Sequence, residues 1–261
     1  MRATVNGIEV AYETAGAGAP VLLLTGLSGV GRAWGDHLDR FARDFEVIVP
    51  DHRGTGGSTR AADGYTIETH AADMAGLVRD LGVGPAHVVG SSTGGAIGQV
   101  MALDHPDVVR SLTLVSSWAG PDPYFDREFT VRRRVLTELG PAAYTEITAL
   151  FLFAPSVAAS RPEVIEAWIA KASAGRSDPD IMAKRIDMIM KHDQRDRLAQ
   201  VAVPTLVLVG DEDICTPPHQ SRELAELIPG ATLTKLTGGH LIYLERPDEF
   251  HRAVADFLRK H

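Results

Sequence analysis

An apolar segment that ends in a glycine-flanked serine constrains this chain more than any other feature of its sequence. Residues 86–90 are predominantly apolar, and the run Gly90-Ser91-Ser92-Thr93-Gly94 begins at the last of them. The run fits Gly-x-Ser-x-Gly only when Ser92 is the centre, because Ser91 lacks glycine two positions away on each side. Side chains at the two glycine positions would collide with a neighbouring strand and helix. The pattern predicts a sharp strand-to-helix turn that exposes Ser92, and the alternative is an ordinary glycine-rich turn.

A serine nucleophile needs a base and an acid that orients the base, and the chain offers both after later strands. Residues 205–209 form an apolar run that is followed by Asp211 and Asp213. Residues 231–236 form the last predicted strand, and Gly-Gly-His ending at His240 follows it. Open α/β sheets build their sites at the carboxyl ends of strands, which is where all these residues lie. The chain order is therefore Ser, Asp, His.

These motifs together resemble the α/β-hydrolase fold superfamily over essentially the whole chain. The segment Leu22-Leu23-Leu24-Thr25-Gly26-Leu27 is similar to the oxyanion loop of that family, which usually has His-Gly where this chain has Thr25-Gly26. The segment Asp51-His52-Arg53-Gly54-Thr55-Gly56-Gly57-Ser58 resembles the family's D-x-R-G-x-G-x-S turn. Within the superfamily the chain is most similar to small bacterial enol-lactonases, carboxylesterases and the aminoacrylate hydrolases of pyrimidine breakdown.

The resemblance implies a role for each candidate residue. Ser92 is expected to be the nucleophile and His240 the base. The family's acid lies three residues after the strand's glycine and four before a proline, which selects Asp213 and leaves Asp211 as a turn residue. The backbone N–H groups of Leu27 and Thr93 are expected to form the oxyanion hole. No cofactor and no metal are expected.

Several alternatives and secondary assignments accompany these roles. His219 is the reserve base, although it precedes the last predicted strand. Asp51 and Arg53 are expected to fix their turn, and Cys215 to be a packed free thiol. Three further histidines sit among charged residues and are expected to be solvated: His105, His192 and His251.

Alternating apolar runs and helical segments predict an α/β-hydrolase fold, with an eight-stranded, mostly parallel sheet flanked by helices. The Asn6-Gly7 pair predicts a tight antiparallel hairpin at the start. The predicted strands cover 3–5, 8–13, 21–25, 45–49, 86–90, 111–116, 205–209 and 231–236, and the helices between or after them cover 33–43, 67–81, 93–104 and 247–260.

Residues 118–202 break this alternation, because they contain no recognisable strand and several proline-punctuated amphipathic segments. The family resemblance implies a helical cap here, inserted after the sixth strand between core segments 1–117 and 203–261. The predicted helices cover 126–139, 142–152, 162–174 and 179–191, with a polar link at 175–178 that could hinge. Candidate residues for the substrate pocket are Trp118, Phe151, Phe153, Met188 and Leu241. One of the three arginines Arg132, Arg133 and Arg134 could meet a substrate carboxylate, while at least two are expected to face solvent.

Composition narrows the classes of partner. The formal net charge of −8 argues against nucleic acid, and no apolar run reaches the ~18 residues that span a membrane. The N-terminus lacks the apolar segment of a signal peptide, and the single cysteine excludes an internal disulfide. We therefore expect a cytoplasmic monomer or homodimer that acts on small molecules.

The expected function is a serine hydrolase that cleaves carboxylic esters or lactones through an acyl-enzyme on Ser92. The same residues could instead attack a C–N or C–C bond, as in a carbamate, an amide, an aminoacrylate or a vinylogous diketone, or could support perhydrolysis. Outside enzymes, the fold could serve as a ligand receptor. A fold hosts many chemistries, so the resemblance alone leaves the substrate open.

Overall fold

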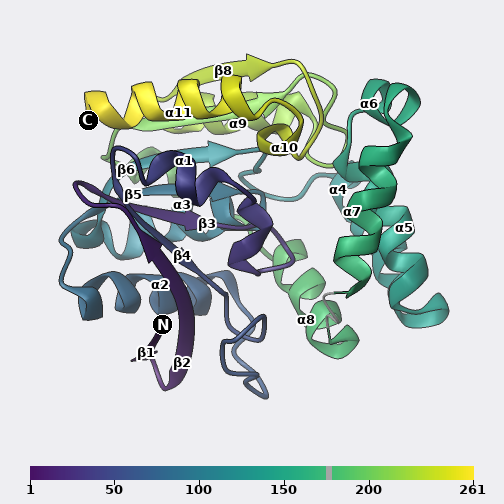
Figure 1. Ribbon diagram of the computed structural model, residues 1–261, viewed down its shortest axis with the longest axis horizontal. Helices are drawn as coiled ribbons and strands as arrows, with labels where there is room; N and C mark the ends of the chain where they lie inside the picture. Colours follow the sequence, from purple (N-terminus) through teal and green to yellow (C-terminus); the bar gives the residue numbers. More distant parts are fainter. Residues whose placement is uncertain (175–177) are drawn as a thin grey trace.

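The computed structural model describes residues 1–174 and 178–261, and a single eight-stranded sheet runs through this part of the chain (Figure 1). Its strand order is β1-β2-β4-β3-β5-β6-β7-β8. The pairs β1/β2 and β2/β4 are antiparallel and all the others are parallel, which confirms the predicted mostly parallel sheet. The strands are β1 Arg2–Val5, β2 Ile8–Ala15, β3 Pro20–Leu24, β4 Glu46–Pro50, β5 Ala86–Ser91, β6 Val109–Val115, β7 Thr205–Gly210 and β8 Thr232–Leu236.

The first turn forms as its sequence predicts. Asn6 and Gly7 have φ angles of 48° and 75°, and Val5 pairs with Ile8 across the hairpin. A two-residue turn with positive φ at both central positions matches the twist of the flanking strands, and asparagine and glycine tolerate that conformation best.

The central strands are buried on both faces, since every residue of β3, β5 and β7 is buried. Helices α2, α3 and α9 pack on one face, and α1 and α11 pack on the other (Figure 1). The helical elements outside the segment between β6 and β7 are η1 Gly31–Trp34, α1 His37–Phe41, α2 Ile67–Leu81, α3 Thr93–Asp104, η2 Pro106–Val108, α9 Pro218–Leu227, α10 Ile242–Glu245 and α11 Pro247–Lys260.

The segment between β6 and β7 is helical and gathers at one end of the molecule (Figure 1). Its elements are α4 Pro123–Arg134, η3 Val135–Leu139, α5 Pro141–Leu152, α6 Pro155–Ser160, α7 Pro162–Ala174, α8 Pro179–Met190 and η4 Leu198–Gln200. The predicted insertion is thus present, and it holds no strand among the residues described. Of the predicted hinge link at 175–178, residues 175–177 lie outside the described residues, and Asp178 caps the start of α8. The division into a core and a separate cap stays a prediction.

Two predicted helices differ from the structure in detail. The helix expected over 33–43 is split into η1 and α1, because Gly35 adopts a φ of 59° between them. The helix expected over 126–139 begins earlier, where the Asp122 side chain accepts a hydrogen bond from Phe125 N, and it ends in the π-helix η3. Helices α6, α9 and α10 were not predicted.

Candidate active site

Ser92 lies in the strained backbone conformation that its sequence predicts. It has φ 53° and ψ −116° between β5 and α3, and its N–H donates to Val115 O at 2.8 Å. A Cβ on Gly90 would lie 2.2 Å from Gly94 O, and a Cβ on Gly94 would lie 2.2 Å from Leu24 O. The two glycines therefore let the strand, turn and helix approach more closely than any side chain allows.

Asp213 and His240 form a buried hydrogen-bonded pair beyond the ends of β7 and β8. His240 Nδ1 donates to Asp213 Oδ2 at 2.9 Å, with Oδ1 at 3.1 Å. Asp213 Oδ1 also accepts the N–H groups of Cys215 and Thr216, each at 2.9 Å. These bonds fix the carboxylate, so that it can orient the imidazole and leave Nε2 free to accept a proton.

The two alternative residues have other partners. Asp211 Oδ1 accepts the N–H of Gly238 at 3.0 Å, which ties the turn after β7 to the turn after β8. His219 pairs with Asp122 at 2.7 Å, with half of its side chain exposed. Asp213 is thus the aspartate that contacts His240, and Asp211 has the turn role expected for it.

The buried carboxylate of Asp213 changes the acid–base properties of His240. Burial alone would lower the pKa of the imidazole, but the negative charge of Asp213 and its hydrogen bond outweigh burial and hold the pKa well above the ordinary value of 6.5. Burial also raises the pKa of the neighbouring Cys215 thiol. Cys215 is therefore a neutral packed thiol, as expected.

The two segments expected to supply the oxyanion-hole N–H groups both lie next to Ser92. Thr93 is the first residue of α3, where the helix dipole favours negative charge. The loop after β3 approaches from the other side, since a Cβ on Gly26, the residue before Leu27, would lie 3.4 Å from Ser92 Cβ. Ser92 Oγ makes no hydrogen bond to His240 among the residues described, and such bonds often tighten only when substrate binds.

Glu245 has a structural role that the sequence did not reveal. Its Oε2 accepts the N–H of Gly239 and its Oε1 accepts the N–H of Ala154, both at 2.9 Å. Leu241 N–H donates to Leu152 O at 3.0 Å in the same region. Burial raises the pKa of Glu245. The turn that carries His240 is therefore bound directly to the helical insertion, a tertiary link that no local pattern signals.

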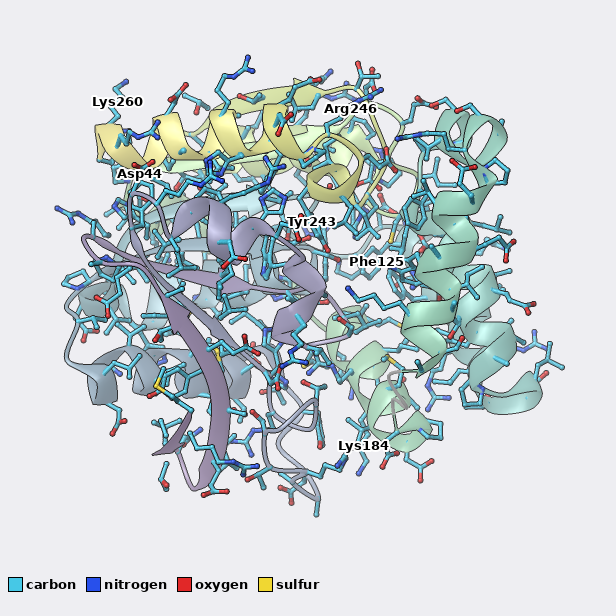
Figure 2. The ribbon with its side chains drawn as sticks, in the orientation of Figure 1. Asp44, Phe125, Lys184, Tyr243, Arg246 and Lys260 are labelled. Carbon is cyan, nitrogen blue, oxygen red and sulfur yellow. The ribbon has the colours of Figure 1, made fainter. Side chains whose placement is uncertain are left out.

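The five candidate pocket residues divide into three groups. Phe153 and Leu241 lie beside the His240 turn, since a Cβ on Gly239 would lie 2.7 Å from Phe153 C. Trp118 and Met188 are buried in the main apolar core. Phe151 is partly buried, and its ring centroid lies 5.6 Å from Arg132 Cζ. Phe125, which is labelled in Figure 2, lies at the junction of the helical insertion and the sheet. Its ring centroid lies 4.8 Å from that of Trp118.

A buried ion pair on α4 lies close to this site. Arg132 Nη1 donates to Glu128 Oε1 at 2.7 Å and approaches Cys215 Sγ at 3.5 Å. Burial raises the pKa of Glu128. Glu128 Oε2 and Arg132 Nε have no hydrogen-bond partner among the described residues. Arg134 is largely exposed, at 68%, whereas Arg133 is 41% exposed and pairs with Asp187 at 2.6 Å.

The expectation of a solvated His192 is wrong. Only 2% of the residue is exposed, its Nε2 lies 3.2 Å from Gln99 Oε1, and burial lowers its pKa to about 4. Residues far away in sequence enclose it, including Trp118, whose ring centroid lies 5.8 Å away. The charged neighbours in its sequence point elsewhere, which a local pattern cannot show.

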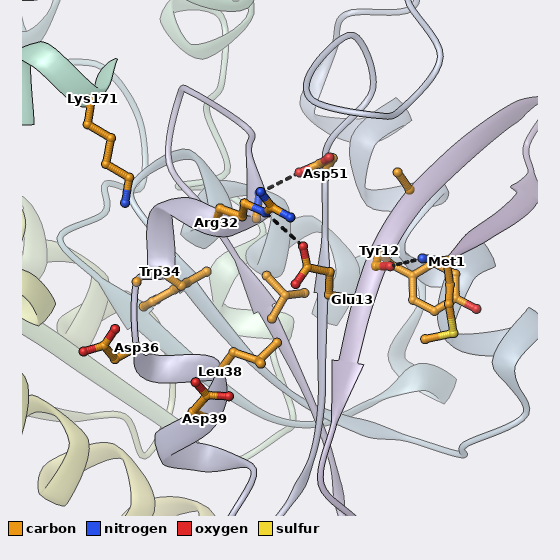
Figure 3. Close-up of a pocket in the computed structure, with 14 residues that line it drawn as sticks. Met1, Tyr12, Glu13, Arg32, Trp34, Asp36, Leu38, Asp39, Asp51 and Lys171 are labelled. Carbon is orange, nitrogen blue, oxygen red and sulfur yellow. Dashed lines mark hydrogen bonds and ion pairs between the residues drawn. The ribbon is translucent and has the colours of Figure 1, made fainter. Parts of the chain in front are cut away.

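Other features bear on ligands. A cavity of about 540 Å³ lies between the N-terminal part of the sheet and Lys171 of α7, away from Ser92, with Arg32 and Glu13 paired in its wall (Figure 3). Within 1–174 and 178–261, no group of three or more His, Cys, Asp or Glu side chains is arranged to hold a metal ion. None of the described helices is long and apolar enough to cross a membrane.

Comparisons with known proteins agree with the fold. The chain matches the alpha/beta hydrolase fold family over residues 19–137 and 158–247. It is 38% identical to "Putative carbamate hydrolase RutD" of Azorhizobium caulinodans, over 95% of this chain and 94% of that protein. Two solved structures are similar. One is a thermophilic esterase from Thermogutta terrifontis, at 30% identity and TM-score 0.89, covering 100% of this chain and 98% of that one. The other is the enol-lactonase of Burkholderia xenovorans, at 28% identity and TM-score 0.90, covering 99% and 100%.

Proposed function

Because the chain belongs to the α/β-hydrolase fold family, we propose that it is a serine hydrolase in which Ser92, His240 and Asp213 carry the reaction. The observation that carries this proposal is the left-handed backbone of Ser92 at the start of α3. A non-glycine residue keeps such a conformation only where the surrounding structure enforces it, and such strain clusters at active sites. Passive ligand binding needs no strained serine, which argues against a receptor.

The proposed reaction proceeds through a covalent intermediate. Ser92 Oγ bonds to the substrate carbonyl carbon while its proton moves to His240 Nε2. The N–H groups of Leu27 and Thr93 donate hydrogen bonds to the carbonyl oxygen and stabilise the negative charge that develops on it. The bond to the leaving group then breaks, and His240 returns the proton to that group. Water repeats the sequence, with His240 as base, to release the acyl group from Ser92.

We propose a carbamate as the substrate class, in preference to the carboxylic ester or lactone expected from the sequence. The RutD relatives support this choice because the similarity extends over nearly the full length of both chains. The ion pair on α4 also supports it. Arg132 Nε is a donor and Glu128 Oε2 an acceptor that have no partner among the described residues. Together they match the alkoxy oxygen and the N–H of a carbamate group whose carbonyl oxygen is bound by Leu27 and Thr93. Buried polar atoms without partners are costly, so a ligand that satisfies both gains affinity.

Esters or lactones are the second candidate, supported by the similarity to the Thermogutta esterase and the Burkholderia enol-lactonase. A panel of carbamates, esters, lactones and amides matched in leaving group separates the two candidates. We expect the highest kcat/KM on a carbamate, and a Glu128→Gln variant should lose more activity on the carbamate than on the ester. An equal loss of activity of Glu128→Gln on the carbamate and on the ester would contradict a role of the ion pair in substrate choice. A wild-type kcat/KM that is highest on esters would favour the second candidate.

The nucleophile is tested by labelling and by substitution. A fluorophosphonate should add one adduct to the wild type, on the peptide that contains Ser92. Ser92→Ala should abolish the adduct and lower kcat by a factor on the order of 10⁶. Ser91→Ala is the matched control, since Ser91 also carries a buried hydroxyl and directly precedes Ser92 at the end of β5. This variant should keep both the adduct and the wild-type kcat. Undiminished turnover in Ser92→Ala would overturn the proposal.

We propose further that residues 118–202 act as a cap that shapes the substrate site. Phe153 is buried beside the His240 turn, and its ring centroid lies 5.9 Å from that of Trp168 on α7. Phe153→Ala should enlarge the acyl side of the site and shift activity towards longer acyl groups. An unchanged length profile in a p-nitrophenyl ester series would mean that Phe153 serves only the core.

A further inference from the structure

Arg185 connects the helical insertion to the loop that carries a proposed oxyanion donor. It lies on α8, and its Nε donates to the backbone oxygen of Leu27 at 2.8 Å. None of the residue is exposed. The bond joins two segments about 160 residues apart, and it ends on the residue whose N–H is expected to face the substrate.

The guanidinium is buried, and no anionic group among the described residues pairs with it. Nη1 contacts His70 Nε2 at 2.9 Å and Arg53 O at 3.4 Å, and Nη2 contacts His52 Nδ1 at 3.2 Å. In the part of the chain that the structure describes, no carboxylate forms an ion pair with Arg185. Buried charges are normally paired, so an isolated buried cation is costly and calls for a reason.

The two histidines are held neutral by this arrangement. Arg185 can only donate, so the contacting nitrogens of His52 and His70 must be unprotonated acceptors. His70 then carries its proton on Nδ1, which donates to Thr66 O at 2.8 Å. Burial, with the charge of Arg185 adding to it, lowers the pKa of His70 to about 3. Burial lowers the pKa of Arg185 itself to about 10, so it remains a cation at neutral pH.

The loop after β3 lies between this cation and Ser92. A Cβ on Gly29 would lie 2.7 Å from Arg185 Nη2, and a Cβ on Gly26 would lie 3.4 Å from Ser92 Cβ. The guanidinium therefore packs directly against one side of the loop while the nucleophile packs against the other. Water is excluded from Arg185, so its charge is screened little in the direction of Ser92.

We propose that Arg185 is a positioning residue for the reaction, which holds Leu27 in place and supplies the positive charge that the oxyanion balances. The inference rests on the proposed function, because it needs an anion that forms beside Ser92 only during the reaction. An interaction that strengthens only as the oxyanion forms raises kcat and leaves ground-state binding unchanged. The isolated cation thus has a partner in the transition state.

The test compares Arg185→Met and Arg185→Lys with the wild type. Arg133→Met is the control, because it removes a cation that pairs with Asp187 of the same helix α8 and is 41% exposed. For Arg185→Met we expect kcat to fall about 10²–10³-fold, as for loss of an oxyanion donor, with KM changed less than about threefold. Arg185→Lys keeps the charge and should recover part of the rate. Arg133→Met should retain the wild-type rate.

A second measurement separates positioning from general support of the fold. An alkyl boronic acid forms a negatively charged tetrahedral adduct with the serine, whereas an uncharged substrate analogue does not. Affinity of Arg185→Met for the boronic acid should fall in proportion to kcat, with the affinity for the analogue retained. Equal losses for both ligands, or a kcat like that of the wild type, would overturn the inference. If Arg185→Met does not fold, the same comparison on Arg185→Lys decides. If the wild type neither hydrolyses any substrate of the panel nor binds the boronic acid, the proposed function itself is refuted.

Discussion

The ion pair between Arg53 and Asp73 provides a sharp test of how this fold is held together. Arg53 Nε and Nη2 donate to the two carboxylate oxygens of Asp73 at 2.9 and 2.8 Å, and the Asn6 amide donates to Oδ1 at 2.8 Å. The side chains are 7% and 0% exposed. The pair joins the turn after β4 to helix α2 and the first hairpin. Asp73→Asn keeps the shape but leaves the Arg53 cation buried without its anion.

The expected loss follows from that geometry. Removing one partner of a buried, doubly hydrogen-bonded pair costs about 3–5 kcal/mol of unfolding free energy. The matched control is Asp107→Asn, which breaks a doubly bonded pair with Arg79 whose side chains are 46% and 61% exposed. Exposed pairs contribute at most about 1 kcal/mol. Both values can be measured by urea unfolding followed by circular dichroism, given a two-state transition.

A double variant distinguishes the charge effect from loss of packing. Arg53→Met combined with Asp73→Leu removes both charges and fills similar volume, so it should be more stable than Asp73→Asn alone. The reasoning is refuted if Asp73→Asn costs no more than Asp107→Asn. It is equally refuted if the double variant is as unstable as the sum of its two single substitutions.

Three further outcomes follow from the site and the core. The rate kcat/KM should fall as pH drops through the raised pKa of His240, because the protonated imidazole cannot accept the Ser92 proton, and a flat profile from pH 5 to 9 would contradict this. Gly94→Ala should prevent correct folding of the turn, seen as loss of soluble protein, since its Cβ would lie 2.2 Å from Leu24 O. Between pH 6.5 and 4 the buried His192, with its pKa lowered to about 4, takes up a proton only on unfolding. It should contribute a loss of at most about 1.4 kcal/mol of stability per unit fall in pH, beside the loss due to other buried histidines such as His70. His192→Gln should therefore reduce the slope measured by urea unfolding between pH 7 and 5.

The sequence predicted the sheet well because its signals are local. The apolar runs, the Asn6-Gly7 turn and the glycines around Ser92 each act within a few residues, and all eight strands appear where they were expected. Contact between an aspartate and His240 was also expected, because both follow strand ends that meet at one edge of the sheet, and the family resemblance selected Asp213 over Asp211.

The burial of polar residues around the site could not be predicted from such local signals. Arg185, Arg132 and His192 are polar residues on amphipathic or charged segments, where exposure is the usual outcome. Their burial depends on contacts with Leu27, Cys215 and Gln99 respectively. A single sequence does not show such long-range contacts, since each partner lies on a different helix turn or loop. The split of the first predicted helix at Gly35 was missed because glycine is also tolerated within helices.

The attachment of the His240 turn to the end of α5 also decides where this protein can be recombined with others. Leu152 O and Ala154 N are both bonded to the segment that follows His240. A chimera in which another protein's sequence begins before Leu152 would lose these two hydrogen bonds. The position of His240 would then be disturbed even if the new insertion folded well. The suitable junction is at Pro155, the first residue of α6, because the chimera then keeps Leu152 and Ala154 of this chain and both of their hydrogen bonds. Replacement of the insertion from Pro155 onward can then change the segment that covers the site without moving His240, the proton acceptor.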